Sequence, residues 1–434
     1  MPESTMRPFT VSERAPLPGS ARSQMRLAML TARRTTLSGR NSTSPLWTPA
    51  RTFRPIPLAG QVTSGYLRSA RNLIRRLRRG RQVLILRPDH LGDVVLFSGA
   101  LHHLRAHYPS DEITVYGLPA GLEYLQHCPH VDRLLAWPPT PPRRPLARRS
   151  MVLLPVRSPT LEHHELMGCF PATEKYGIAG DFSNQSVESD EAAHLLYTSR
   201  LALDRTRRSD HELVVTRDFL RHLGISVELA DVFPEAWTTP ADSRWAEAHV
   251  PRSADGITLA IAPGVTNPKD KIYPPDRSPV ALAQVWSAPA PVDAVIFGGS
   301  DDRVVCSDVA GRLKHCAGLR SVIDLAGKTT VRQMIEGLRR ADVVLSADAA
   351  PLHVATALGR PTVGIMGGGH FGRFYPWGDP EINRVVNRPM DCYWCDWRCR
   401  YPTFRCVEEI APAAVAHELR AAIAAGARLA EGRG

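Results

Sequence analysis

Residues 341–361 read ADVVLSADAAPLHVATALGRP, which combines an apolar run, a polar turn and a helical pattern in direct succession. The apolar run over 343–345 predicts a buried strand, and Pro351 stands at the first turn of the following helix, where proline is favoured. Gly359 and Pro361 end that helix. Strands that alternate with helices in this way build a parallel sheet, so the stretch predicts an α/β fold.

The same alternation extends outward over most of the chain in two series. Predicted strands lie at 83–86, 113–116, 151–154, 257–262, 294–297, 322–324, 343–345 and 362–365. Two similar α/β halves that face each other hold a ligand in the cleft between them. We therefore expect a Rossmann-like domain over 83–240, a second over 256–410, a linker near 234–255, and a final helix within 411–434.

The first 82 residues differ from the rest in composition and charge. They carry sixteen Arg and no Lys against Glu3 and Glu13, a formal net charge of +14, so the rest of the chain sums to −3 of the overall +11. Residues 1–63 are rich in Pro, Ser, Thr and Arg without a lasting apolar period, which favours a disordered tail. Residues 64–82 place apolar residues at helical spacing with Arg between them, which predicts a basic amphipathic helix.

Such a helix either lies on an anionic membrane surface or is a solvated lead-in docked on the protein. The chain holds no run of eighteen apolar residues and no secretory leader, so we expect a cytoplasmic protein. The membrane alternative would place residues 64–81 as a peripheral contact on the inner face of the inner membrane. Taken alone, the Arg-rich residues 1–82 have the positive charge needed to bind nucleic acid. The near-neutral remainder lacks the basic surface of a nucleic-acid-binding protein, so no specific nucleic acid partner is expected.

Eight cysteines in a chain of this length do not indicate a disulfide scaffold, and cytoplasmic thiols stay reduced. Four of them, Cys392, Cys395, Cys399 and Cys406, lie close together in the sequence. They could bind a structural Zn or Fe ion. Alternatively they are buried reduced thiols, in a packed lobe that the Tyr and Trp residues between them indicate. We assign them no catalytic role, and the predicted site contains no metal and no cofactor.

The turn after the first predicted strand carries an acid in place of a dinucleotide signature. Residues 87–93 read RPDHLGD, which lacks the G-x-G-x-x-G of dinucleotide-dependent oxidoreductases. Asp93 opens the next helix. It is either an N-terminal cap or a carboxylate that faces the cleft and takes a proton from an acceptor hydroxyl.

Two turns of the second half carry groups suited to a diphosphate. Thr266 follows the strand at 257–262, with Lys271 shortly after it, and a hydroxyl, a lysine and backbone N–H groups can together hold phosphate. Asp348 and His353 follow the strand at 343–345, at the start of a helix whose N-terminus attracts anions. Capping can explain Asp348 and a core position can explain His353, but both turns feed the same predicted cleft.

A third turn of the second half is rich in glycine. Residues 367–369 are Gly-Gly-Gly and follow the predicted strand at 362–365. Glycine lacks a Cβ, so such a loop permits close backbone approach. We expect a ligand to approach there.

Several of these stretches together resemble glycosyltransferase family 9, the heptosyltransferases. The matching stretches are residues 86–95, 100–101, 108–109, 324–329 and 348–361, and the similarity runs from about residue 83 to 425. The resemblance implies an inverting, metal-independent transferase of the GT-B type, with two Rossmann-like domains facing across a cleft. It also implies ADP-heptose or a related nucleotide sugar as donor.

Position by position, the resemblance implies roles for five residues. Asp93 would be the general base. Thr266 and Lys271 would bind the donor diphosphate, and Asp348 and His353 would lie at the donor phosphates and sugar. A lysine and helix dipoles would stabilise the departing diphosphate without a metal. The chain departs from the family pattern at positions 350 and 90, where it has Ala and His in place of Gly and of Ser or Thr.

The leading hypothesis is transfer of a heptose or related sugar from an ADP-sugar to a hydroxyl of a lipopolysaccharide core or another lipid-linked saccharide. An alternative within the fold is a heptosyltransferase that modifies a protein of the autotransporter type. A nucleotide-sugar epimerase or hydrolase on the same fold is an alternative of another class. An epimerase needs acid/base residues on both faces of its sugar, and only Asp93 stands out in the first half.

Overall fold

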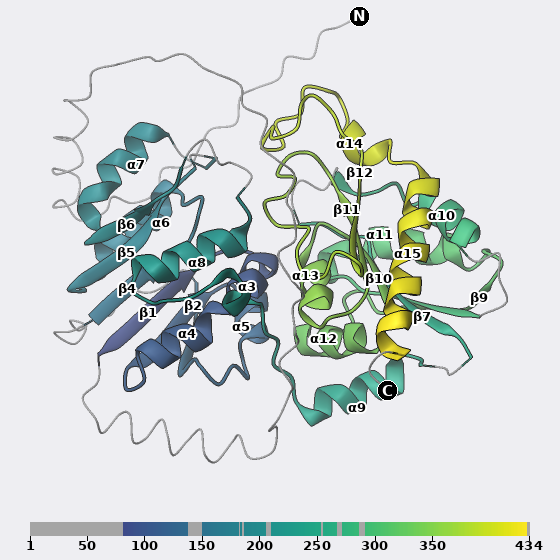
Figure 1. Ribbon diagram of the computed structural model, residues 1–434, viewed down its shortest axis with the longest axis horizontal. Coiled ribbons are helices and arrows are strands. Elements are labelled where there is room, and N and C mark those ends of the chain that lie inside the picture. Colours follow the sequence, from purple (N-terminus) through teal and green to yellow (C-terminus); the bar gives the residue numbers. More distant parts are fainter. Residues whose placement is uncertain are drawn as a thin grey trace, which may run out of the picture.

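The computed structural model describes residues 81–137, 150–181, 183–184, 186–204, 210–252, 255–266, 271–285 and 291–431. The expected tail over 1–63 lies outside the described residues, as does the expected helix over 64–82 except for its last two positions. Of those two, Gln82 is the first residue of strand β1. The described residues form two α/β halves that face each other (Figure 1), which confirms the predicted fold class.

The N-terminal half is a six-stranded sheet with the order β3-β2-β1-β4-β5-β6, in which all neighbours run parallel. Its strands are β1 Gln82–Arg87, β2 Glu112–Gly117, β3 Arg133–Ala136, β4 Ser150–Leu154, β5 Glu174–Ala179 and β6 Ser199–Ala202. Its helices are α3 Leu91–Phe97, α4 Ala100–His107, α5 Pro119–Tyr124, α6 Leu161–Cys169, α7 Val187–Ala193, η1 His194–Leu196, α8 Glu212–His222 and η2 Leu229–Val232.

The C-terminal half is a second parallel sheet with the order β12-β11-β10-β7-β8-β9. Its strands are β7 Ile257–Ala262, β8 Val292–Ile296, β9 Leu319–Asp324, β10 Val343–Ala347, β11 Thr362–Met366 and β12 Asn383–Asn387. Its helices are α10 Arg277–Val285, η4 Ser300–Asp302, α11 Arg303–Leu313, α12 Val331–Arg340, α13 Ala350–Ala357, α14 Arg405–Glu408 and α15 Pro412–Glu431. Helix α15 runs along this half, beside α10 (Figure 1).

Each strand that the apolar runs predict is present, and four further strands lie toward the outer parts of the sheets. These four are β3, β5, β6 and β12, with the sequences RLLA, EKYGIA, SRLA and NRVVN. Strands in the outer part of a sheet are only half-buried, so they tolerate charged and polar residues that interrupt an apolar run. The central strands β4 and β10 are buried throughout.

The helix expected after β1 breaks into α3 and α4 at Ser98 and Gly99. Ser98 Oγ donates to the Val95 carbonyl at 2.7 Å and accepts the Glu235 N–H at 2.8 Å. A Cβ on Gly99 would lie 2.5 Å from the Val232 carbonyl oxygen. The break therefore makes room for the chain where it crosses from the N-terminal half toward the C-terminal half.

The stretch expected as a linker contains a helix, α9 Pro240–His249. The helix packs on α12 of the C-terminal half. Glu336 of α12 accepts hydrogen bonds from Thr238 Oγ1 at 2.6 Å and Ser243 Oγ at 3.1 Å. The connection between the halves is thus anchored to the second of them.

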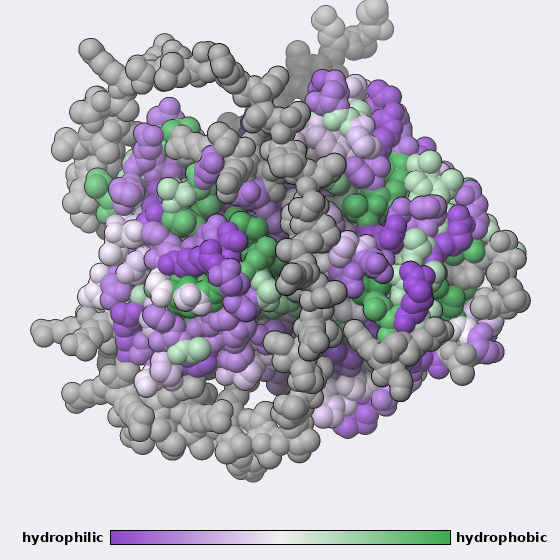
Figure 2. All heavy atoms as spheres, viewed as in Figure 1, coloured by the Kyte–Doolittle hydropathy of each residue, from purple (hydrophilic) through white to green (hydrophobic). Residues whose placement is uncertain are grey.

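The surface is mainly hydrophilic on the face shown in Figure 2, where polar residues separate smaller apolar patches. The large apolar side chains exposed among the described residues are Leu161, Leu195, Val280 and Val304, which belong to four different helices. No helix in the described part of the chain combines the length and apolar character needed to cross a membrane.

Candidate active site

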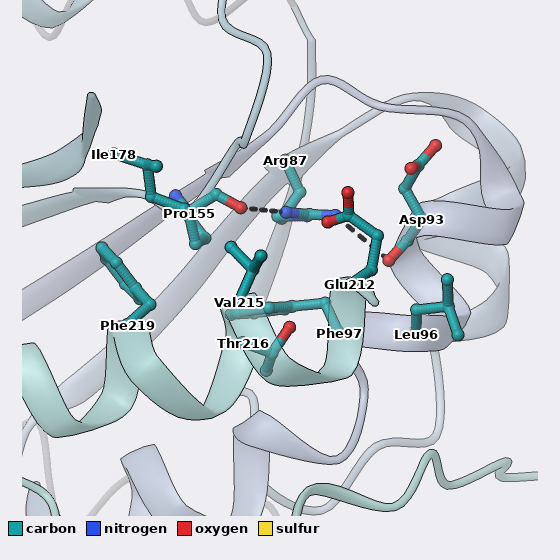
Figure 3. Close-up of a pocket in the computed structure, with 10 residues that line it drawn as sticks. All are labelled: Arg87, Asp93, Leu96, Phe97, Pro155, Ile178, Glu212, Val215, Thr216 and Phe219. Carbon is teal, nitrogen blue, oxygen red and sulfur yellow. Dashed lines mark hydrogen bonds between the residues drawn. The ribbon is translucent and has the colours of Figure 1, made fainter. Parts of the chain in front are cut away.

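Asp93 lies on the first turn of α3, at the edge of the sheet where the parallel strands end. The N-cap of this helix is His90, and no side chain caps it. No described residue donates a hydrogen bond to the Asp93 carboxylate, which points away from the small pocket in Figure 3. The carboxylate is therefore not used as a helix cap and is available for chemistry.

The surroundings of Asp93 suit a general base. The pKa of Asp93 is raised to about 7. Burial is the largest cause, the negative charges of Asp89 and Glu212 act in the same direction, and the positive charges of Arg87 and Arg373 oppose them. A base is most effective when its pKa lies near the working pH, since it is then both deprotonated and basic enough to take a proton.

Arg87 fixes the turn that presents Asp93. Its guanidinium donates to the Asp93 carbonyl at 3.1 Å and to the Pro155 carbonyl, as Figure 3 shows. It also lies 3.1 Å from Asp89 Oδ2 and 4.8 Å from the centroid of the Phe97 ring. One buried arginine thus joins the end of β1 to the first turn of α3 and to the end of β4.

Lys271 and Asp348 of the C-terminal half interact electrostatically, and Lys271 also interacts in this way with Asp93 of the N-terminal half. Burial lowers the pKa of Lys271, and the negative charges of Asp348 and Asp93 oppose this effect. Burial raises the pKa of Asp348, and the positive charge of Lys271 opposes it. The lysine therefore lies within electrostatic range of one carboxylate from each half.

A cavity of about 350 Å³ lies between the halves and is large enough for part of a nucleotide sugar. Predicted Thr266 lines it, and so does the N-terminus of α13 at Ala349, Ala350 and Pro351. Ala349 is the N-cap and offers no side chain to the free N–H groups of the helix. These N–H groups and the helix dipole favour a negatively charged group in the cavity.

His90, Leu91 and Thr329, from stretches that resemble the family, also line the cavity. Other residues that line it were not singled out from the sequence: Ala120, Gly298, Gly299, Ser300, Asp301, Asp302, Thr330, Val331 and Met334. The Gly-Gly-Ser turn directly after a buried strand is the signal that could have indicated residues 298–300. The turn is tightly packed, because Asp302 Oδ2 accepts the Gly299 N–H at 2.9 Å and occupies the space that a Cβ on Gly264 would need.

His353 lies at the contact between α3 and α13, away from the lining of the cavity. Its side chain is buried, and Trp377 Nε1 donates to its Nδ1 at 3.2 Å. Burial lowers the pKa of His353 to about 3, so the ring is neutral. A Cβ on Gly92 would lie 3.3 Å from His353 Cδ2, so the ring forms the surface on which the Gly92 backbone rests. The donor-binding role of His353 stays a prediction.

The glycine loop at 367–369 meets rings of the protein itself, where a ligand was expected. A Cβ on Gly367 would lie 2.7 Å from the Trp397 ring, and one on Gly368 or Gly369 would overlap the ring of Tyr393 or Trp397. Both rings belong to the cysteine-containing stretch between β12 and α14. Its close approach to the loop explains the three glycines.

The four clustered cysteines form no disulfide with one another in the structure. Burial raises the pKa values of Cys395 and Cys406, and the other thiols of the cluster contribute in the same direction. Among the described residues, no group of three or more His, Cys, Asp and Glu is arranged to hold a metal ion. Cys406 Sγ accepts the Gly368 N–H at 3.4 Å, which ties the cluster to the glycine loop.

Comparison with known proteins identifies the family. The model of glycosyltransferase family 9 (heptosyltransferase) matches residues 168–395. Lipooligosaccharide heptosyltransferase 2 of Campylobacter jejuni is 21% identical over 344 residues, which cover 78% of this chain and 98% of the relative.

Two solved structures share the fold. Glycosyl transferase family 9 from Veillonella parvula has a TM-score of 0.62 and 16% identity, over 80% of this chain and 98% of its own. The Escherichia coli ADP-heptose lps heptosyltransferase II has a TM-score of 0.55 and 18% identity, over 79% and 98% of the two chains. The fold is therefore of the GT-B type, and because the family model covers more than half of the sequence, the chain belongs to glycosyltransferase family 9, the heptosyltransferases.

Proposed function

We propose that this enzyme transfers a heptose from an ADP-sugar to a hydroxyl of a lipopolysaccharide or lipooligosaccharide core, with inversion at the anomeric carbon. The observation that carries the proposal is Asp93, a carboxylate with a raised pKa on helix α3, which packs against α13 and whose charge acts on Lys271 of the other half. The names of the relatives from C. jejuni and E. coli support the choice of sugar and acceptor.

In the proposed reaction, the Asp93 carboxylate accepts the proton of the acceptor hydroxyl. The acceptor oxygen attacks the anomeric carbon from the face opposite the diphosphate, and the bond from that carbon to the diphosphate oxygen breaks. ADP leaves with the electron pair of that bond. The products are the glycosylated acceptor, ADP and a proton on Asp93, which passes to solvent.

The C-terminal half would stabilise the charge that develops on the leaving diphosphate. Lys271 supplies a positive charge, Thr266 a hydroxyl, and the α13 N-terminus backbone N–H groups. Asp348 lies close to Lys271 and would keep its ammonium charged in the buried site, since the carboxylate opposes the lowering of the lysine pKa. These groups can act in place of a metal ion.

Calorimetric titration of the full chain with ADP, UDP and GDP tests the donor. We expect ADP to bind, Lys271→Ala to weaken its binding, and Asp93→Asn to leave binding intact while abolishing transfer. Failure of the folded protein to bind any of the three would refute the proposed donor site. Transfer assays with a lipid-linked saccharide and with an autotransporter protein then decide the acceptor, and transfer to the protein alone would replace the proposed acceptor by the alternative.

A further inference from the structure

Trp397 lies on the cysteine-containing loop between β12 and α14, and its ring faces Lys271. The Lys271 Nζ atom is 4.8 Å from the centroid of the Trp397 ring. An ammonium group is attracted to the negative face of an indole, most strongly where water is excluded. Lys271 is only partly exposed, and burial lowers its pKa, so the contact lies in such an environment.

The Trp397 ring is held from several sides. Its Nε1 donates to His370 Nδ1 at 3.2 Å, and the His370 Nε2 atom lies 3.2 Å from Asp396 Oδ1. Burial lowers the pKa of His370 to about 4, so the ring stays neutral and its Nδ1 remains an acceptor. Phe404 packs against the indole with its ring centroid at 5.7 Å and the ring planes at 74°. The indole therefore has one defined orientation.

The backbone around Trp397 adopts an uncommon conformation to place this ring. Trp394, Asp396 and Trp397 have φ values of 68°, 49° and 60°, in the left-handed region that large side chains rarely adopt. Such conformations persist where the surroundings hold them, and they concentrate at functional sites. Here the glycine loop holds this conformation in place. Because Gly367 and Gly369 lack a Cβ, the Trp397 indole packs directly on their backbone.

We propose that Trp397 is a positioning residue that holds the Lys271 ammonium toward Asp348 and Asp93, so that the cysteine-containing loop shapes the donor-phosphate site. This inference rests on the proposed role of Lys271 in donor binding. It gives the loop a task in the proposed reaction that needs neither a metal nor a reactive thiol. It also explains why a glycine triplet and three residues of positive φ meet at one place.

A double-mutant cycle with ADP as the probe tests the inference in the full chain. Calorimetry compares wild type, Trp397→Leu, Lys271→Ala and the double variant. We expect Trp397→Leu to weaken ADP binding roughly threefold to thirtyfold, which corresponds to the usual range of a cation–π contact. In the Lys271→Ala background the same change should have no further effect. Trp397→Phe keeps a ring face and should lie between wild type and Trp397→Leu.

Trp394→Leu is the matched control, because it removes a neighbouring indole of the same loop that also has a positive φ and does not contact Lys271. It should leave ADP binding unchanged. If Trp397→Leu does not fold, Trp397→Phe replaces it in the cycle, and its smaller effect should likewise vanish without Lys271.

Equal losses of ADP affinity with and without Lys271 would show that the ring only supports the fold, and would overturn the inference. Unchanged ADP affinity in folded Trp397→Leu would overturn it as well. A Lys271→Ala variant that binds ADP like wild type would refute the proposed donor role itself, and the positioning role would fall with it. The single variants thus separate failure of the inference from failure of the proposed function.

Discussion

Arg373, which follows β11 in the C-terminal half, donates a hydrogen bond from Nε to the Glu212 carboxylate of α8 in the N-terminal half at 2.7 Å. The same guanidinium donates to Asp181 Oδ2 and to Ser158 Oγ, each at 3.0 Å. The Arg373 carbonyl accepts the Glu212 N–H at 2.8 Å. A buried ion-pair network therefore joins the two halves beside Asp93, whose pocket Glu212 also lines (Figure 3).

Replacement of Arg373 should destabilise the protein strongly. Its side chain is 9% exposed, and Arg373→Met would remove the closer of the two guanidinium partners of Asp181 and Glu212, which keep Arg157 at 3.5 and 3.6 Å. Loss of one member of a buried ion pair costs about 3–5 kcal/mol. Urea unfolding measures the loss of free energy of unfolding. In Arg373→Met combined with Glu212→Gln, the loss should be smaller than in Arg373→Met alone, and a larger loss would contradict this account.

Glu212→Gln should shift the pH dependence of transfer. The Glu212 charge raises the pKa of Asp93, and the base acts only when deprotonated, so activity falls as the pH drops through this pKa near 7. Removal of the charge lowers the pKa and moves the acid limb of kcat/KM to lower pH. Glu228→Gln is the matched control, because Glu228 is exposed and pairs with Arg221. If the acid limb of kcat/KM stays at the same pH in Glu212→Gln, the Glu212 charge does not affect the pKa of the base Asp93.

The part of the site that the sequence predicts depends on one regularity of parallel sheets. Asp93, Thr266 and Asp348 each follow a strand, and the carboxyl ends of parallel strands meet at one edge. The two halves face each other, and of the three residues Thr266 lines the cavity between them. The strands themselves are predictable because the central ones are buried on both faces and read as continuous apolar runs.

The rest of the site depends on contacts that no local pattern marks. Arg373 and Glu212 are 161 positions apart. From the sequence alone, each would be predicted to be a charged residue on the solvated surface. Likewise, burial of His353 depends on Trp377 and on the packing of α3 against α13. The sequence shows the aromatic residues of the cysteine-containing loop. It does not show that their rings pack on the glycine loop, because this contact depends on the tertiary structure of the C-terminal half.

Asp93→Asn should stabilise the protein at neutral pH while it abolishes transfer. The folded state raises the pKa of Asp93 from about 3.8 to about 7, so the folded protein binds this proton more tightly than the unfolded chain. The resulting penalty is absent below pH 3.8, grows as the pH rises to 7, and is complete above it. Allowing for the partial exposure of the side chain, we expect a gain on the order of 2 kcal/mol at pH 8.

The measurement is the free energy of unfolding of both proteins at pH 4 and pH 8. The difference between Asp93→Asn and wild type should be small at pH 4 and favour the variant at pH 8. A difference of the same size at both values would mean that the ionisation of Asp93 does not cause it.

Two glycines on helices offer a matched test of the contact between the halves. A Cβ on Gly311 of α11 would meet no described atom within 4 Å, and alanine is the better helix former, so Gly311→Ala should stabilise the fold by about 0.5–1 kcal/mol.

A Cβ on Gly92 of α3 would lie 3.3 Å from His353 Cδ2. Since His353 is buried and held by Trp377, the ring has little room to move, and the added methyl would push α13 away from α3. Gly92→Ala should therefore lose the gain seen in Gly311→Ala and lower kcat for transfer, because Asp93 moves relative to Lys271. Equal stabilisation by both changes, with kcat unaltered, would show that the contact between Gly92 and His353 does not set the geometry of the site.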